Sequence, residues 1–345
     1  MKAALLTAPD ALVLTELPVP ALESGDVLIR VRAATICGTD IRIFRGRKTA
    51  GIRYPSVLGH EFAGEVVDTS GNPGLSVGDR VALCPAISCG RCHLCKIGQE
   101  NLCKDGQAVG YEIDGAFAEF IRIPARAVAA GNIRKLPEAT GFDEAALAEP
   151  LACVLNGQEK VGVTAGDVVL VLGAGPIGLL HVYLARLRGA AKIIVSDPNA
   201  HRRDAAMTGG ADVTIDPRNE DVAARVAEET AGMGATVVIC AIGVPALARQ
   251  ASDLVAHGGR ISLFAGFSKG EMAEMDVNAI HYNEITVTGA FGLSRRDYDR
   301  AFDMIAGRGM DVRGLITHRY GLESIVEAFE TAESGGAIKV AIIND

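Results

Sequence analysis

The sequence is poor in several features that mark whole classes of protein. It contains no tryptophan, and aromatic residues make up 5% of its 345 positions. No apolar run approaches the roughly 20 residues of a membrane-spanning helix, and the N-terminal apolar stretch, broken by Pro9 and Asp10, is unlike a secretory signal. The formal net charge of −8, with no long basic run, argues against a nucleic-acid surface. These absences favour a cytoplasmic protein.

What the chain does contain is typical of a globular protein with two cores. Hydrophobic residues make up 49% and charged residues 22%, and 345 residues are long for one domain. The forty glycines indicate many tight turns, and there is no repeat or low-complexity tract. In a cytoplasmic setting, the eight cysteines are expected to be thiols or metal ligands rather than disulfides.

Two patterns of hydrophobic residues divide the chain. Residues 1 to about 130 show short strand-like runs between Gly, Pro, Asn and Asp, which predicts a small β barrel or sandwich. From about residue 167, continuous Val/Ile/Leu runs alternate with helical stretches, which predicts a doubly wound α/β domain with a parallel sheet. The C-terminal part can return to the first domain. We therefore expect a discontinuous domain of residues 1–150 and 291–345, and a second domain of residues 151–290.

A glycine-rich turn opens the α/β pattern and predicts a dinucleotide site. "VLGAGPIG" supplies G-x-G-x-x-G between a buried strand and a helix, and Asp197 follows at the end of the next strand. The acidic residue favours NAD over NADP, although Arg202 and Arg203 lie near enough to oppose that preference. A tight turn without a nucleotide is the alternative. The expected cofactor-binding residues are Gly173, Gly175, Pro176, Ile177, Gly178, Asp197, Arg202, Ala265 and Phe267.

A short segment holds four cysteines in a C-x2-C-x2-C-x7-C array, namely Cys89, Cys92, Cys95 and Cys103. Four thiolates on one loop can surround a tetrahedral zinc ion and leave no position for substrate, so the array predicts a structural zinc site. An iron–sulfur cluster uses similar ligands, but with other common spacings. Disulfides are a further alternative that a cytoplasmic setting disfavours.

Four more residues could form a second metal site. Cys37 lies in "TICGTD", His60 and Glu61 in "LGHEFAG", and Glu149 in "LAEPLAC". Taken singly, each has an ordinary structural explanation. Together they supply a thiolate, an imidazole and carboxylates, ligands that suit a catalytic zinc with one position left open.

These motifs, in this order, resemble the zinc-dependent medium-chain dehydrogenase/reductase family, and within it the polyol (sorbitol-like) dehydrogenases. The resemblance covers essentially the whole chain and rests on "ICGTD", "GHEFAGEVV", "GDRVAL", the four-cysteine segment, "EPLAC", "GAGPIG" and "SD". It implies a GroES-like β-rich catalytic domain, a Rossmann NAD-binding domain, and two zinc ions per chain. Members of the family are commonly dimers or tetramers, so we expect a homo-oligomer.

The resemblance also implies roles for individual residues. Cys37 and His60 become ligands of the catalytic zinc, and Glu61 and Glu149 share the remaining carboxylate position. Thr39 matches the hydroxyl that relays the alcohol proton. Arg42 stands where many relatives carry a relay histidine, and an arginine cannot shuttle a proton; it could approach the cofactor pyrophosphate, bind a substrate anion or lie in solvent.

The expected reaction is hydride transfer between a secondary hydroxyl of a small-molecule polyol and NAD, giving a ketose. Two enzymatic alternatives remain open, an L-threonine 3-dehydrogenase-type enzyme and a dehydrogenase of sugar-alcohol phosphates. A third alternative is a crystallin-like or regulatory protein that keeps the fold without catalysis. Intact ligands at Cys37, His60 and Glu149 argue against this last hypothesis, because a binding module needs no open metal site.

Overall fold

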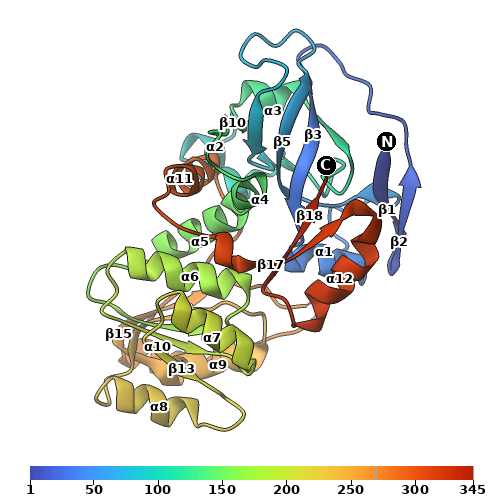
Figure 1. Ribbon diagram of the computed structural model, residues 1–345. Helices are drawn as coiled ribbons and strands as arrows, with labels where there is room; N and C mark the ends of the chain where they lie inside the picture. The colour runs from blue at the N-terminus through green and yellow to red at the C-terminus, as the bar shows by residue number, and fades with distance from the viewer. Residues whose placement is uncertain (269, 345) are drawn as a thin grey trace. The chain divides into compact units, whose positions relative to one another are not determined.

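The computed structural model describes residues 1–268 and 270–344, which form two compact units (Figure 1). The first unit comprises Met1–Ala152 together with the chain from Leu293 onward, and the second comprises Cys153–Gly292. Within the described residues, no helix is long and apolar enough to cross a membrane.

The first unit is built on β-sheets. Its central sheet has the order β10-β6-β5-β3-β18-β17, with β9 also paired to β3, and two smaller sheets have the orders β2-β1-β4 and β7-β8. The strands are β1 Lys2–Ala8, β2 Ala11–Glu16, β3 Val27–Thr35, β4 Ser56–Val57, β5 Glu61–Asp68, β6 Arg80–Leu83, β7 Ala86–Ile87, β8 Gln107–Ala108, β9 Phe120–Ile123, β10 Ile133–Lys135, β17 Ile316–Gly321 and β18 Lys339–Ile343.

Strand β3 organises this unit because it pairs with both β5 and β18, which are far apart in sequence. Figure 1 shows these strands side by side, β3 and β5 in blue and β18 in red. Their inward side chains, among them Val31, Phe62 and Ile342, are almost fully buried in one hydrophobic core. Burial of this apolar surface is what stabilises the sheet.

Short helices cover and connect the sheets of the first unit. They are α1 Gly38–Phe44, α2 His93–Lys96, α3 Ala125–Ala129, α4 Phe142–Ala146, α11 Arg295–Ala306 and α12 Ile325–Ser334, with 3-10 turns at Glu100–Leu102, Arg313–Leu315 and Leu322–Ser324. Helix α11 begins at a capping box in which the Ser294 and Asp297 side chains each bond the other's backbone N–H.

The second unit is a six-stranded parallel sheet of order β13-β12-β11-β14-β15-β16, the doubly wound arrangement that the sequence predicts. Its strands are β11 Val168–Leu172, β12 Lys192–Ser196, β13 Val213–Ile215, β14 Ala235–Cys240, β15 Val255–Leu263 and β16 Thr286–Gly289. Its helices are α6 Pro176–Leu187, α7 Ala200–Thr208, α8 Val222–Glu229, α9 Pro245–Leu254 and α10 Val277–Tyr282, and α5 Ala148–Val161 leads into it.

The continuous apolar runs of this unit are buried on both faces of the sheet. Leu170, Ile194 and Val238, on three neighbouring strands, have no exposed surface. A parallel sheet with helices on both faces requires this pattern. A sheet with one solvent-exposed face instead has strands in which apolar and polar residues alternate. Cys240 is part of the same core, and Cys84 is buried in the first unit.

Candidate active site and metal centres

Antiparallel pairing of β3 with β5 brings the first metal-ligand cluster together. Thr35 at the end of β3 pairs with Glu61 at the start of β5. The residues that follow Thr35 therefore lie beside those that precede Glu61, and Cys37 meets His60. The Cys37 Sγ atom, a ring nitrogen of His60 and a carboxylate oxygen of Glu61 all lie within 4.8 Å of one another.

Helix α1 fixes the orientation of two of these side chains. Cys37 is its N-cap residue, and Asp40 completes a capping box by accepting a hydrogen bond from the Cys37 backbone N–H at 2.9 Å. The other Asp40 oxygen lies 3.2 Å from His60 Nδ1, and both side chains are buried. A carboxylate at Nδ1 leaves Nε2 of the imidazole for a metal ion, an arrangement typical of metal-ligating histidines.

Glu61 is fully buried and held by two donors. Lys339 Nζ, at the start of β18, donates to Glu61 Oε1 at 2.8 Å, and the Thr35 hydroxyl donates to Oε2. Burial alone would lower the pKa of Lys339, but the charge and hydrogen bond of Glu61, together with the charges of Cys37 and Glu149, raise that pKa above its ordinary value. The pair is therefore ionic, and a buried ion pair of this kind needs both partners.

Glu149 lies in the first turn of α5 and is also buried, although it is outside the 4.8 Å group. Its charge contributes to raising the pKa values of Lys339 and of Tyr111, so it lies in the neighbourhood of the cluster. Tyr111 packs against the His60 ring at 5.1 Å between ring centroids, and burial is the largest cause of its raised pKa. One thiolate, one imidazole and two carboxylates are a donor set that fits zinc.

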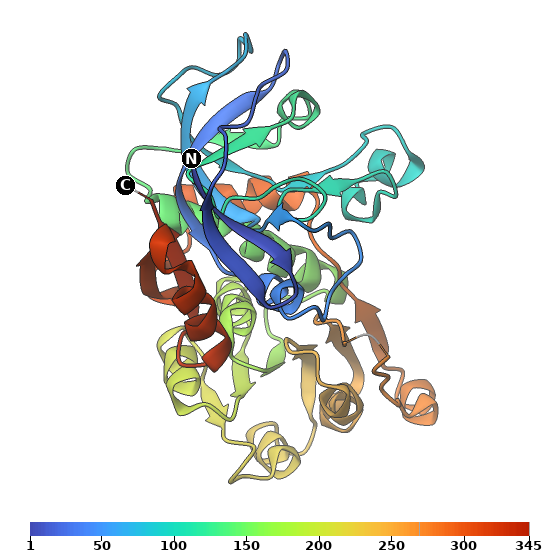
Figure 2. The same ribbon diagram turned by 90° about the vertical axis from the view of Figure 1, so that its right-hand side faces the viewer.

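The four-cysteine segment, Cys89 to Cys103, forms a second, separate cluster in the first unit, and we call this segment the lobe. The Sγ atoms of Cys92 and Cys95 are 3.5 Å apart, and those of Cys89 and Cys95 and of Cys92 and Cys103 are 3.9 Å apart. A tetrahedron with 2.3 Å zinc–sulfur bonds has edges of about 3.8 Å, so this spacing fits zinc and is far too long for disulfides. Figure 2 shows the lobe, in teal, projecting from the sheet strands of its unit.

Backbone amides of the lobe also favour the ionised thiol that a metal requires. The N–H groups of Arg91 and Cys92 lower the pKa of Cys89 to about 6, and the Cys92 N–H lies 3.4 Å from Cys89 Sγ. Cys89 also donates its own N–H to Cys103 Sγ at 3.4 Å. Such N–H···S bonds stabilise thiolates without adding a ligand.

The glycine-rich turn of the second unit has the geometry of a pyrophosphate-binding loop. Gly173 has φ +98°, which only glycine adopts without strain, and a Cβ at Gly178 would lie 1.9 Å from the Gly173 carbonyl oxygen. A Cβ at Gly175 would meet only an Arg202 nitrogen at 4.0 Å. Gly175 is the N-cap of α6, whose free N–H groups suit an anion.

Asp197 lies at the end of β12 and is almost fully buried. It accepts hydrogen bonds from the Ala174 N–H at 2.7 Å and the Asn199 N–H at 2.8 Å, so it ties the glycine-rich turn to the start of α7. Carboxylate oxygens have further lone pairs that can accept ribose hydroxyls. Arg203 donates to the Asp197 carbonyl oxygen and pairs with Asp216, while the buried Nε of Arg202 has no hydrogen-bond partner among the described residues.

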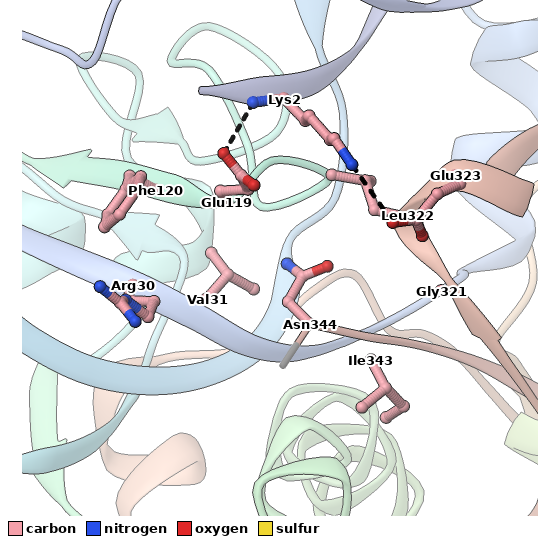
Figure 3. A pocket seen from close by; sticks show the side chains of 10 residues that line it. All are labelled: Lys2, Arg30, Val31, Glu119, Phe120, Gly321, Leu322, Glu323, Ile343 and Asn344. Atoms are coloured by element: carbon pink, nitrogen blue, oxygen red, sulfur yellow. Dashed lines mark hydrogen bonds and ion pairs between the residues drawn. The ribbon is translucent and has the colours of Figure 1, made fainter.

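A pocket of about 390 Å³ in the first unit is lined by none of the metal-ligand candidates (Figure 3). Its cations are already engaged: Lys2 donates to Glu323, and Arg30 lies over the Phe120 ring at 5.3 Å. The pocket therefore offers no chemistry comparable with that of the Cys37 cluster.

Comparison with known proteins gives matches to two domain families. Residues 23–135 match the alcohol dehydrogenase GroES-like domain, and residues 176–307 match the zinc-binding dehydrogenase domain. The chain is 37% identical over 338 residues to L-threonine 3-dehydrogenase of Pyrococcus furiosus, an alignment that covers 96% of this chain and 94% of that protein. The chain belongs to the zinc-dependent medium-chain dehydrogenase/reductase family.

Solved structures of the family are similar over their whole length. A zinc-binding dehydrogenase from Sinorhizobium meliloti 1021, bound to NADP, superposes with a TM-score of 0.93 at 33% identity and 99% coverage of both chains. An alcohol dehydrogenase from E. coli CFT073, complexed with NADH, gives 0.90 at 31% identity, covering 100% of this chain and 99% of the other. The predicted family, fold class and zinc and NAD(P) cofactors are confirmed, and the protein is a dehydrogenase of the alcohol dehydrogenase type.

The curated relatives carry the name of one of our alternative hypotheses and not of the polyol dehydrogenases. The Pyrococcus furiosus relative is an L-threonine 3-dehydrogenase, and relatives from Bacillus licheniformis and Francisella philomiragia carry the same name. None of these three is named a polyol dehydrogenase. Sequence reasoning also missed the residues that hold the ligands, Asp40, Thr35 and Lys339. Two signals were available: Asp40 stands three residues after Cys37, as a capping box requires, and Lys339 is a lone charge in an apolar strand.

Proposed function

We propose that the protein is a zinc- and NAD-dependent dehydrogenase that oxidises the secondary hydroxyl of L-threonine or of a similar small polar hydroxy compound. The observation that supports the reaction is the cluster of the half-buried Cys37 with the buried His60 and Glu61, together with the Asp40 carboxylate at His60 Nδ1. The names of curated relatives of the chain support L-threonine. A polyol is the second candidate, supported by the resemblance of the motifs, among them "EPLAC" with Glu149, to the polyol dehydrogenases.

In this proposal Cys37 and His60 hold the catalytic zinc, and Glu61 or Glu149 supplies the carboxylate. When bound, zinc lowers the pKa of an alcohol hydroxyl, and NAD accepts the hydride. The residues of the chain position these groups. Thr39, half-buried in the first turn of α1, has a hydroxyl that can both accept and donate, so it can pass the alcohol proton outward. Arg42, in the last turn, stays protonated and cannot replace it.

The test of this proposal is a screen with protein shown by metal analysis to contain two zinc ions per chain. NADH formation would be followed with L-threonine, with polyols and inositols, with sugar-alcohol phosphates and with simple secondary alcohols. We expect L-threonine or a polar hydroxy compound to give the highest kcat/KM. Absence of NADH formation with every compound, in protein with both zinc ions, would contradict the proposal.

We further propose that NAD is preferred over NADP because Asp197 occupies the ribose position. Asp197→Ala removes an acceptor and a negative charge, so the preference for NAD should fall roughly ten- to a hundredfold, about 1–3 kcal/mol. Asp197→Asn keeps an acceptor for the Ala174 N–H, and Asp204→Ala, on the exposed side of α7, is the control. The ratio of kcat/KM values for the two cofactors is the measurement. An unchanged ratio in Asp197→Ala would contradict the assignment.

The homo-oligomer and the cytoplasmic location stay predictions. Light scattering of the purified protein tests the first, and fractionation of the source cells tests the second.

A further inference from the structure

One cation near the metal cluster has no role in the reaction described above. Helix α1, which begins after the ligand Cys37, ends at Phe44, and the chain then turns back on it. The N–H groups of Arg47 and Lys48 both donate to the Arg42 carbonyl oxygen, at 2.8 and 3.1 Å. The backbone of Lys48 is therefore fixed relative to the helix that presents the metal ligand.

The Lys48 side chain is half-buried and turned toward an aromatic ring. Its Nζ lies 4.4 Å from the centre of the Tyr111 ring, a cation–π distance, and 3.4 Å from the Ala50 carbonyl oxygen. Burial is the largest cause of its lowered pKa, the charge of Arg42 lowers it further, and Glu112 and Asp40 only partly oppose them. Among the described residues, no carboxylate oxygen lies within the 4.0 Å of an ion pair with this ammonium.

Tyr111 connects this ammonium to the metal cluster. One contact of its ring is with Lys48 Nζ at 4.4 Å, and another is with the His60 ring at 5.1 Å between centroids. The ammonium and the imidazole are thus separated by less than the sum of these two distances. This separation is on the scale of a small molecule with a hydroxyl at one end and an anionic group a few carbons away.

A partly desolvated ammonium with spare donors and no carboxylate partner is suited to binding an anion. Lys2, in the pocket of Figure 3, does not share this state, because it is paired with Glu323. We propose that Lys48, held against Tyr111, binds a carboxylate of the substrate and so selects hydroxy carboxylates over neutral alcohols of the same size. This inference rests on the proposed dehydrogenase function and deepens it, because L-threonine and sugar acids both carry the required group.

The experiment compares substrates that differ only in the carboxylate. L-threonine is matched with L-threoninol, in which CH2OH replaces the carboxylate, and a sugar acid is matched with the sugar alcohol of the same configuration. In the wild type, the carboxylate of each pair should have a kcat/KM about ten- to a hundredfold higher, the range expected for one charge-assisted hydrogen bond. Lys48→Met should remove this difference, leave the neutral partner unaffected, and leave the KM for NAD unchanged. Lys48→Arg should restore part of the difference.

Two controls separate this inference from its alternatives. Lys160→Met, at an exposed lysine of α5, removes the same charge elsewhere and should leave the selectivity intact. Calorimetric titration of wild type and Lys48→Met with L-threonine and with the sugar acid measures binding without turnover, and the affinity for at least one of them should fall by a similar factor.

The outcomes distinguish the two proposals. Equal kcat/KM for the members of each pair in the wild type, equal losses on both members in Lys48→Met, or a loss confined to NAD would overturn the role of Lys48 while the dehydrogenase function stands. If neither these pairs nor any other compound of the screen is oxidised, the proposed function fails, and the titration then decides for Lys48: unchanged affinities would overturn its role, and a loss confined to the variant would support it.

Discussion

The two metal-ligand clusters of the first unit are built in opposite ways. The lobe takes its four ligands from the segment between Cys89 and Cys103, and its sulfur atoms are half-exposed and held by neighbouring backbone N–H groups. The Cys37 cluster is more deeply buried, and Glu61 depends on Lys339, 278 positions away in sequence. A structural metal site with four protein ligands can thus be built from one short segment. A catalytic metal site with an open coordination position instead needs residues from distant parts of the sequence to hold its ligands in place.

The largest effect is expected when one of the four cysteine ligands of the lobe is removed. Cys92→Ser should lower the zinc content from two ions per chain to one and unfold the lobe, because binding free energy at such a site is folding free energy, about 10–16 kcal/mol in zinc-finger peptides. The Cys37 cluster should keep its ion. Metal analysis and limited proteolysis of the lobe are the measurements, and Cys84→Ala, at a buried cysteine outside both clusters, is the control. A variant that retains two zinc ions would contradict the assignment.

The Cys37 cluster should instead be destabilised by a substitution at a residue that is distant in sequence. Lys339→Met leaves the buried Glu61 carboxylate without its cation, so the free energy of unfolding should fall by about 3–5 kcal/mol, as for other broken buried pairs. Lys339→Arg keeps the charge and is the matched control. The double variant with Glu61→Gln should recover part of the loss, since no charge is then left unpaired. Chemical denaturation of the zinc-loaded protein measures all three, and wild-type stability of Lys339→Met would refute the dependence.

A smaller effect is expected when the ligand His60 is kept but the residue that orients its ring is changed. Asp40→Asn weakens the contact at His60 Nδ1, so zinc affinity at the Cys37 cluster should fall about 10–100-fold, while the zinc of the lobe stays bound. Competition with a chelator resolves the two ions by their different affinities. Asp105→Asn, an exposed carboxylate beside the lobe, should change neither. Equal weakening of both ions in Asp40→Asn would show that the clusters are not independent.

The same contrast explains how much the sequence could predict. The lobe, the glycine-rich turn and the parallel sheet are local patterns, so spacing and hydrophobic periodicity predict them correctly. The candidate ligands Cys37 and His60 follow from motifs, and their meeting follows from the β3–β5 pairing. The Glu61–Lys339 pair depends on β18 returning beside β3, which no local pattern reveals. For the same reason Lys48 and Tyr111, which come together from distant segments, were not predicted.

The finest test concerns the second donor to Glu61. Thr35 lies on β3, between the strands that carry Glu61 and Lys339, and its hydroxyl donates to the Glu61 oxygen that Lys339 approaches at 2.5 Å. Thr35→Val keeps the shape and removes only this hydrogen bond. Because Lys339 still compensates the charge, the free energy of unfolding should fall by only about 1 kcal/mol. Thr35→Ser keeps the hydroxyl, and its free energy of unfolding should lie between those of the wild type and of Thr35→Val. Denaturation curves measured beside those of Lys339→Met give the comparison directly. A loss in Thr35→Val as large as in Lys339→Met would mean that the hydroxyl, and not the ion pair, holds Glu61 in place.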